Sequence, residues 1–211
     1  MTDLNKELER AVELAKLLNR EVGNEEQLFL QANLLVEEGI SELAKAVFES
    51  DRTQKRDALA DTLVIAAGGC YISGFEYETT SLHSWSLGSL MAHAAMATAY
   101  ASVKLLPEAS AQFSEVIDEV EYVAEDEGIN LAADLKAVND SNLSKFCLTI
   151  AEGIDTQQQY LTQFNLESEL KETGNERYPY AVYSLEEKGN FKIGKLLKSI
   201  NYKAPVFEAE S

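Results

Sequence analysis

The chain has 211 residues, of which 45% are hydrophobic, so it can bury the core of one or two globular domains and its composition does not indicate disorder. Its 18 basic and 36 acidic residues give a net charge of −18, which opposes binding to the phosphate backbone of nucleic acid or to an anionic membrane. Cys70 and Cys147 form no C-x-x-C motif, and the N-terminal residues lack a signal-peptide core, so we expect reduced thiols in a cytoplasmic protein.

Helical periodicity predicts most of the N-terminal two thirds of the chain. We expect helices at about 3–20, 25–49, 54–72, 84–104, 107–128 and 131–153. The helix at 84–104 carries Trp85, Met91 and Met96 among many Ala and Ser residues. Small residues at this density favour close packing between helices over exposure to lipid. This segment is therefore expected to be a buried or interface helix, and not a membrane span.

The sequence changes character after Gly153. A Gln-rich stretch leads into TGNERYP at 173–179, which is typical of a turn. Residues 180–199 then predict two short β-strands around a turn at 187–190. The expected fold is all-α: a helical bundle over 1–153, followed over 154–211 by a loop and a short C-terminal β-hairpin that pack on the same domain.

Two pairs of carboxylates interrupt the apolar pattern. Glu38 and Glu42 lie four residues apart, as do Asp57 and Asp61, so each pair shares one face of its helix. Two carboxylates about 4 Å apart repel by roughly 4 kcal/mol at an effective dielectric near 20. A chain that gathers four of them needs a cation, and oxygen ligands select Mg²⁺, Mn²⁺ or Ca²⁺. The alternative is an ordinary solvated face, which fits Asp61 least because its neighbours in sequence are apolar.

This helix pair resembles the all-α nucleoside triphosphate pyrophosphohydrolases, which include MazG, the dimeric dUTPases and the phosphoribosyl-ATP pyrophosphohydrolases. Their pattern is EExxE on one helix and ExxD on the next. Two further blocks resemble phage-type members: VNDSNLSKF at 138–146 and GKLLKSINYKAPVF at 194–207. The resemblance implies the helical bundle of that family and Mg²⁺-dependent hydrolysis, with Mn²⁺ as the other metal, of a (deoxy)nucleoside triphosphate to the monophosphate and pyrophosphate.

The chain also departs from the family pattern. Gly39 stands where the second Glu of EExxE is expected, and Asp57-x-x-x-Asp61 replaces ExxD. We expect the segment at about 78–126 to be a helical pair inserted between two halves of the core. These departures affect the ligand set more than the fold.

The resemblance implies a role for each matching residue. Glu38, Glu42, Asp57 and Asp61 become the metal ligands, and Glu38 or Glu37 the catalytic base that activates water. A carboxylate cage offers the substrate only negative charge, so its polar and cationic partners must come from elsewhere. The expected substrate-binding residues are Asn139, Ser141, Asn142, Lys145, Lys195 and Lys198. The competing interpretations are polar helix caps in the first block and exposed hairpin lysines in the second.

Two other functions remain open. One is a dUTP- or dCTP-specific pyrophosphatase of the same fold, and the other is a non-catalytic helical interaction protein, which Gly39 favours. We expect a homo-oligomer, a dimer or tetramer, that forms through the helix at 84–104. The alternative is that the insertion replaces the second subunit's helices. The expected location is the cytoplasm, or the host cytoplasm if a phage encodes the chain.

Overall fold

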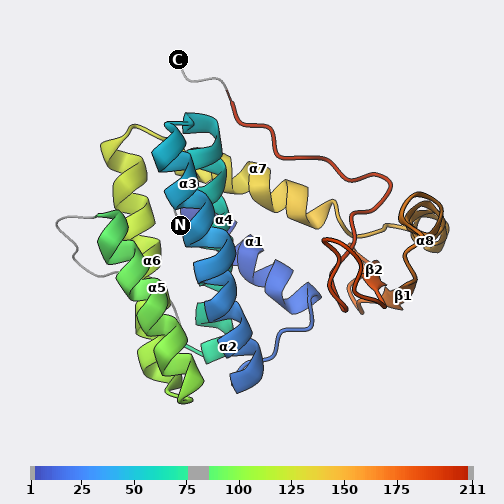
Figure 1. Cartoon of the computed structure of the whole chain (residues 1–211), viewed down its shortest axis with the longest axis horizontal. Coiled ribbons are helices and arrows are strands. Elements are labelled where there is room, and N and C mark those ends of the chain that lie inside the picture. Colours follow the sequence, from blue (N-terminus) through green and yellow to red (C-terminus); the bar gives the residue numbers. More distant parts are fainter. Residues whose placement is uncertain (1–2, 76–85, 209–211) are drawn as a thin grey trace. The chain divides into compact units, whose positions relative to one another are not determined.

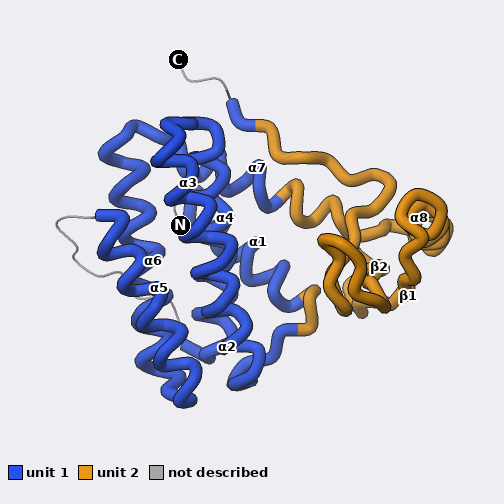
Figure 2. The backbone as a smooth tube through the Cα atoms, viewed as in Figure 1, with its two compact units in different colours: residues 1–16, 20–139, 207–211 blue, residues 17–19, 140–206 orange. Residues whose placement is uncertain are grey.

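The computed structural model describes residues 3–75 and 86–208. It is mostly helical and has a two-stranded antiparallel hairpin near its C-terminal end, which confirms the predicted combination (Figure 1). Figure 2 colours two compact units: unit 1 comprises residues 1–16, 20–139 and 207–211, and unit 2 comprises 17–19 and 140–206. The change of unit after residue 139 precedes the boundary expected at 153. Among the described residues, no helix is long and apolar enough to cross a membrane.

Unit 1 is built from helices that follow the predicted ones closely. The helix expected at 25–49 is continuous but contains a π-helical turn, η1, between two α-helical parts. The elements are α1 (Asp3–Leu17), α2 (Glu25–Leu34), η1 (Leu35–Ile40), α3 (Ser41–Glu49), α4 (Arg52–Ser73), α5 (Leu87–Ser102), α6 (Leu106–Asp126) and α7 (Leu131–Leu143), the last of which runs on into unit 2. Ser84 and Trp85, expected at the start of α5, lie outside the described residues.

Polar caps fix where α3 ends and α4 begins. Ser50 adopts a left-handed conformation (φ 56°) after α3, and the Asp51 side chain accepts a hydrogen bond from the Gln54 backbone N–H at 2.9 Å. A capping carboxylate satisfies a backbone donor that has no partner within the helix. This short connection sets the register in which Asp57 and Asp61 follow.

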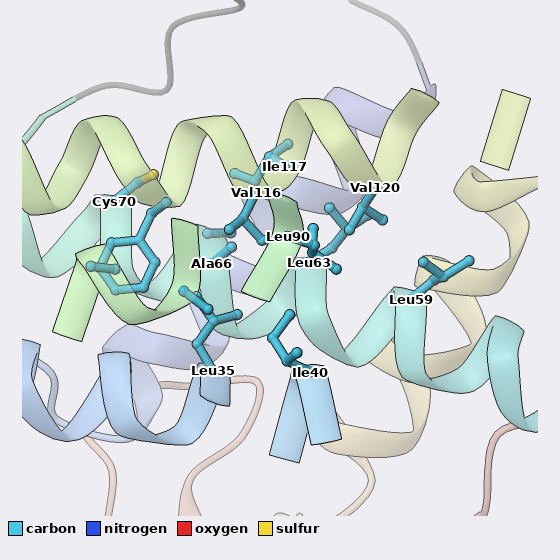
Figure 3. Close-up of a cluster of buried hydrophobic side chains, with 14 of the residues drawn as sticks. Leu35, Ile40, Leu59, Leu63, Ala66, Cys70, Leu90, Val116, Ile117 and Val120 are labelled. Atoms are coloured by element: carbon cyan, nitrogen blue, oxygen red, sulfur yellow. The ribbon is translucent and has the colours of Figure 1, made fainter. Parts of the chain in front are cut away.

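An apolar core in unit 1 joins the helices on either side of the expected insertion. Helix α4 packs against α2, η1, α3 and α6, and α5 packs against α6 and α2. Figure 3 shows the buried side chains that meet there: Leu35, Ile40, Leu59, Leu63, Ala66, Cys70, Leu90, Val116, Ile117 and Val120. Because α5 and α6 contribute to this core, the described part of the segment predicted as an insertion is integral to unit 1.

Unit 2 differs from the sequence prediction in its helix and in its hairpin. The helix expected at 131–153 ends at Leu143, and a separate helix, α8 (Ile150–Phe164), extends through the stretch expected to be a loop. The Thr149 side chain caps α8 by accepting from the Glu152 backbone N–H, and Asn165 ends it in a left-handed conformation (φ 48°). The local cap therefore starts a helix that the polar Gln-rich sequence did not reveal.

The hairpin forms one strand earlier than expected. Strand β1 (Ser168–Glu172) pairs with β2 (Tyr180–Ser184) across the predicted turn at 173–179. The run expected as the second strand, after 187–190, makes only isolated bridges within the described residues, between Lys188 and Phe191 and between Tyr183 and Leu196. Gly194 has φ +76° there, a conformation that interrupts an extended strand.

Candidate active site

The π-helical turn η1 presents two of the predicted acidic residues. The Ser41 backbone N–H donates to the Val36 carbonyl five residues earlier, which widens the helix locally. Within this turn Gly39 is buried, whereas Glu37 and Glu38 are exposed. Single π-helical turns recur at functional sites because they rotate side chains out of the α-helical register. Both candidate bases are therefore accessible to water.

Gly39 has a packing role that the sequence did not indicate. A Cβ at this position would lie 3.0 Å from Thr62 Oγ1 and 3.6 Å from Thr62 Cα, and Thr62 is fully buried. Gly39 therefore faces α4, where the two helices approach closely. A side chain at position 39 would point into this contact, and not toward exposed Glu38.

The remaining predicted ligands lie on α3 and α4. Glu42 is exposed, and Asp57 and Asp61 are both partly exposed. Although its neighbours in sequence are mostly apolar, Asp61 lies on a partly open face of α4, between the buried residues Ala60 and Thr62. Asp57 and Asp61 thus reach the boundary between core and solvent.

Two of these carboxylates, Glu38 and Asp57, act electrostatically on a third, Glu42. Partial burial, the charge of Glu38 and the charge of Asp57 raise the pKa of Glu42, and Lys45 partly offsets them. Burial, followed by the charge of Asp134, raises the pKa of Asp57. We call Glu38, Glu42 and Asp57 the acidic cluster. It gathers residues from η1, α3 and α4.

The donor chemistry of the acidic cluster fits a hard divalent cation, since all its ligands are carboxylate oxygens whose mutual repulsion a cation relieves. The geometry is open. Within residues 3–75 and 86–208, no three His, Cys, Asp or Glu side chains converge closely enough to hold a metal ion. Binding Mg²⁺ would therefore require side-chain rotation or further oxygen ligands from substrate and water.

A buried ion pair adjoins the acidic cluster and was not predicted. The Arg56 guanidinium donates from Nε to Asp134 Oδ2 at 2.7 Å and from Nη2 to Asp134 Oδ1 at 2.5 Å, and the two residues are 7% and 1% exposed. Bidentate geometry makes this a strong charge-assisted contact. No sequence signal marked this pair, because Arg56 lies among other charged residues such as Lys55 and Asp57, and Asp134 is followed closely by Lys136.

Asn139, a predicted substrate-binding residue, serves the interior of unit 1. It is buried, and its Nδ2 donates to the Glu7 backbone carbonyl at 2.8 Å and to Glu7 Oε2 at 3.1 Å. These contacts hold α7 to α1. The amide nitrogen is thereby engaged within the fold.

The other predicted substrate-binding residues belong to unit 2, where two of them share Tyr202. Ser141 is buried and its Oγ donates to the Tyr202 hydroxyl at 3.3 Å, and Lys198 Nζ lies 4.1 Å from the centroid of the Tyr202 ring. Ser144 Oγ also accepts from the Lys203 backbone N–H at 2.9 Å. The parts of the two sequence blocks that belong to unit 2 therefore contact each other, through Ser141 with Tyr202 and Ser144 with Lys203.

The remaining lysines have local partners. Lys145 Nζ donates to Asn142 Oδ1 at 2.6 Å, so these two predicted residues form one contact. Lys195 is exposed and its Nζ donates to the Asn190 carbonyl at 3.3 Å. Lys145 is held more firmly than Lys195, because it is only partly exposed.

No family model matches the chain, and neither the curated proteins nor the solved structures gave a match. Evidence for function therefore comes from the side chains themselves. The acidic cluster is the feature of unit 1 with the clearest chemical consequence.

Proposed function

We propose that the protein hydrolyses a (deoxy)nucleoside triphosphate to the monophosphate and pyrophosphate, with Mg²⁺ or Mn²⁺ as cofactor. The observation that carries the proposal is the acidic cluster, in which partial burial and the charges of Glu38 and Asp57 raise the pKa of Glu42. Carboxylates whose charges repel one another favour a bound divalent cation, which side-chain rotation would allow them to share. When bound, that cation would neutralise phosphate charge.

The chain's own residues suit the other requirements of the reaction. Glu37 and Glu38 are exposed on η1, so either can accept a proton from water that approaches the acidic cluster. Asp61 lies one helical turn beyond Asp57 on α4 and is the fourth proposed ligand. Within unit 2, Lys145 Nζ donates to Asn142 Oδ1, so two of the substrate-binding residues that the family resemblance implies lie together.

A homo-oligomer, dimer or tetramer, is part of the proposal. Helix α5 carries no Asp, Glu, Lys or Arg, and its Met91 and Met96 are 51% and 41% exposed. Such a face on a chain of net charge −18 favours contact with another apolar surface. Light scattering tests this, since a mass of 23.3 kDa in solution would mean a monomer. We further propose a cytoplasmic location, where free nucleotides are available.

Pyrophosphate release from a panel of nucleoside triphosphates, with and without Mg²⁺, tests the activity. We expect Asp61→Asn to lose hydrolysis while its thermal unfolding temperature stays at or above that of the parent, because the change removes a charge but keeps the shape. Asp155→Asn, at an exposed position on α8, is the matched control and should hydrolyse at the parental rate. If Asp61→Asn hydrolyses triphosphates at the parental rate, Asp61 is not a metal ligand of the active site. Absence of Mg²⁺-dependent release from every triphosphate would favour the non-catalytic alternative, and a strict preference for dUTP or dCTP would favour the specialised pyrophosphatase.

A second measurement detects the metal without relying on turnover. A ligand that binds only the folded chain stabilises it by RT ln(1 + [L]/Kd). Mg²⁺ should therefore raise the unfolding temperature of the parent more than that of Asp57→Asn. Equal shifts in the two proteins would place the metal elsewhere.

A further inference from the structure

The side chain of Arg56 is covered by residues from the far end of unit 1. Its Nη1 donates to the Glu208 backbone carbonyl at 2.9 Å, and its Cζ lies 5.3 Å from the centroid of the Phe207 ring. We call Phe207 and Glu208 the strap. The Arg56 guanidinium therefore contacts Asp134 along one edge, through Nε and Nη2, and contacts the strap through Nη1 and through the Phe207 ring.

The strap lies in an irregular and largely exposed segment of the chain. Residues 203–208 adopt neither helix nor strand, and Val206 immediately before the strap is 82% exposed. Phe207 itself is only partly buried, and Glu208 is exposed. Displacement of the strap would thus remove the carbonyl acceptor from Nη1 and the aromatic ring from beside Arg56, while Asp134 still holds the other edge.

The chemistry of the strap indicates what could replace it. An aromatic ring together with a carbonyl acceptor is the combination that a nucleobase with a ring carbonyl presents, and guanidinium planes stack on both aromatic side chains and bases. Phosphate fits less well, because the Asp134 carboxylate already pairs with Arg56 and a second carboxylate, Asp57, follows Arg56 directly on α4. An uncharged base avoids the repulsion that these carboxylates exert on an anion.

We infer that Arg56 is a subsite for a nucleobase bearing a ring carbonyl, and that the strap occupies this subsite in competition with the base. The inference rests on the proposed function for its choice of ligand and extends it by naming the group that contacts the base. It also predicts that removing the Phe207 ring strengthens base binding, whereas loss of a structural contact would not.

A titration of the full-length protein with thymidine in metal-free buffer tests the subsite, with binding detected by calorimetry or NMR. For Phe207→Ala we expect a roughly tenfold lower Kd than for the parent, equivalent to about 1.4 kcal/mol. Phe207→Tyr keeps an aromatic ring and should match the parent. Phe48→Ala is the matched control, because it removes a ring of the same kind at a position that is 90% exposed.

A second variant isolates the guanidinium. Adding Arg56→Lys to Phe207→Ala retains a cation for Asp134 but removes the planar group, so the tenfold gain should disappear. An unchanged or higher Kd for thymidine in folded Phe207→Ala would overturn the inference. So would tighter binding of inorganic phosphate without tighter binding of thymidine, which would mean an anion site.

Hydrolysis plays no part in this titration, so the two proposals can fail separately. A protein that gains thymidine affinity as expected but releases no pyrophosphate from any triphosphate would keep the subsite and refute the proposed function. An active enzyme whose Phe207→Ala variant binds thymidine like the parent would refute the subsite alone.

Discussion

Replacing Gly39 by Glu would restore the EExxE pattern, yet we expect it to damage the protein. The structure directs position 39 into the contact with α4, where Thr62 Oγ1 lies 3.0 Å from the place of the new Cβ and Leu35 Cδ1 lies 3.5 Å away. Both Leu35 and Thr62 are 0% exposed, so the added carboxylate would enter a closed interface. The expected result is loss of stability with no gain in hydrolysis.

The magnitude follows from three contributions. Overpacking a filled helix contact costs about 1–3 kcal/mol. Burying an uncompensated carboxylate costs several kcal/mol more. Replacing Gly inside a helix returns only about 1 kcal/mol. We therefore expect Gly39→Glu to lower the free energy of unfolding by about 3 kcal/mol or more, against a typical total of about 5–15 kcal/mol.

Urea unfolding followed by far-UV circular dichroism measures this change, and a constant slope shows that the unfolding reaction is the same. Gly39→Ala should stay within about 1 kcal/mol of the parent, because its helical gain of about 0.5–1 kcal/mol offsets the tight contact with Thr62. Ser41→Glu adds the same carboxylate at an exposed position nearby and should change stability by no more than about 0.5 kcal/mol. If Gly39→Glu unfolds like the parent and releases pyrophosphate faster, position 39 faces the acidic cluster and the packing argument is wrong.

Three further changes test the surroundings of the site. Glu42→Gln should stabilise the protein at pH 7 by no more than about 0.5 kcal/mol, because solvent screens the repulsion at this exposed position. Because the pKa of Glu42 is raised in the folded state, the folded protein binds the Glu42 proton more tightly than the unfolded chain, and the parent loses stability as pH rises from 4.5 through the raised pKa. Below pH 4.5 the stability advantage of Glu42→Gln over the parent should therefore vanish. A stability difference that does not depend on pH would contradict this argument. Asp134→Asn should cost about 3–5 kcal/mol in urea unfolding, because it removes the bidentate carboxylate partner of the buried Arg56 charge, and a loss below about 1 kcal/mol would show that water reaches the pair. Gly69→Ala places a Cβ 2.5 Å from the Phe113 ring and should cost about 1–3 kcal/mol, so unchanged thermal unfolding would mean that the ring can move aside.

Local patterns predicted the helices of unit 1 well, because each one combines apolar periodicity with an identifiable start or end. Asp51 and Ser50 show this at the junction of α3 and α4. The π-helical turn was not predictable from periodicity, since the one inserted residue leaves Leu35 at the start of the turn and Ile40 at its end both buried. Helix α8 was missed for the opposite reason: its exposed Gln residues weaken the pattern, and its cap, Thr149, lies inside a stretch that was expected to be one continuous helix.

Some features of the candidate site could be predicted from the sequence, and others could not. The spacing of four between Glu38 and Glu42 was visible in the sequence, and so was the spacing between Asp57 and Asp61. The partner of Arg56 was not, because Asp134 lies 78 positions away and only tertiary packing joins them. Strand pairing failed for a related reason, as the choice between two candidate hairpin turns depends on which neighbour each strand meets.

The discontinuity of unit 1 bears on how the chain is made. Residues 207–208, which cover Arg56, are synthesised after all of 140–206. At ribosomal rates of about 5–20 residues per second, the rest of unit 1 waits on the order of several seconds for them. During that interval the Arg56–Asp134 pair is in place without its cover. A nascent chain thus passes through a stage in which Arg56 lacks the Glu208 carbonyl and the Phe207 ring, because neither residue has yet been synthesised.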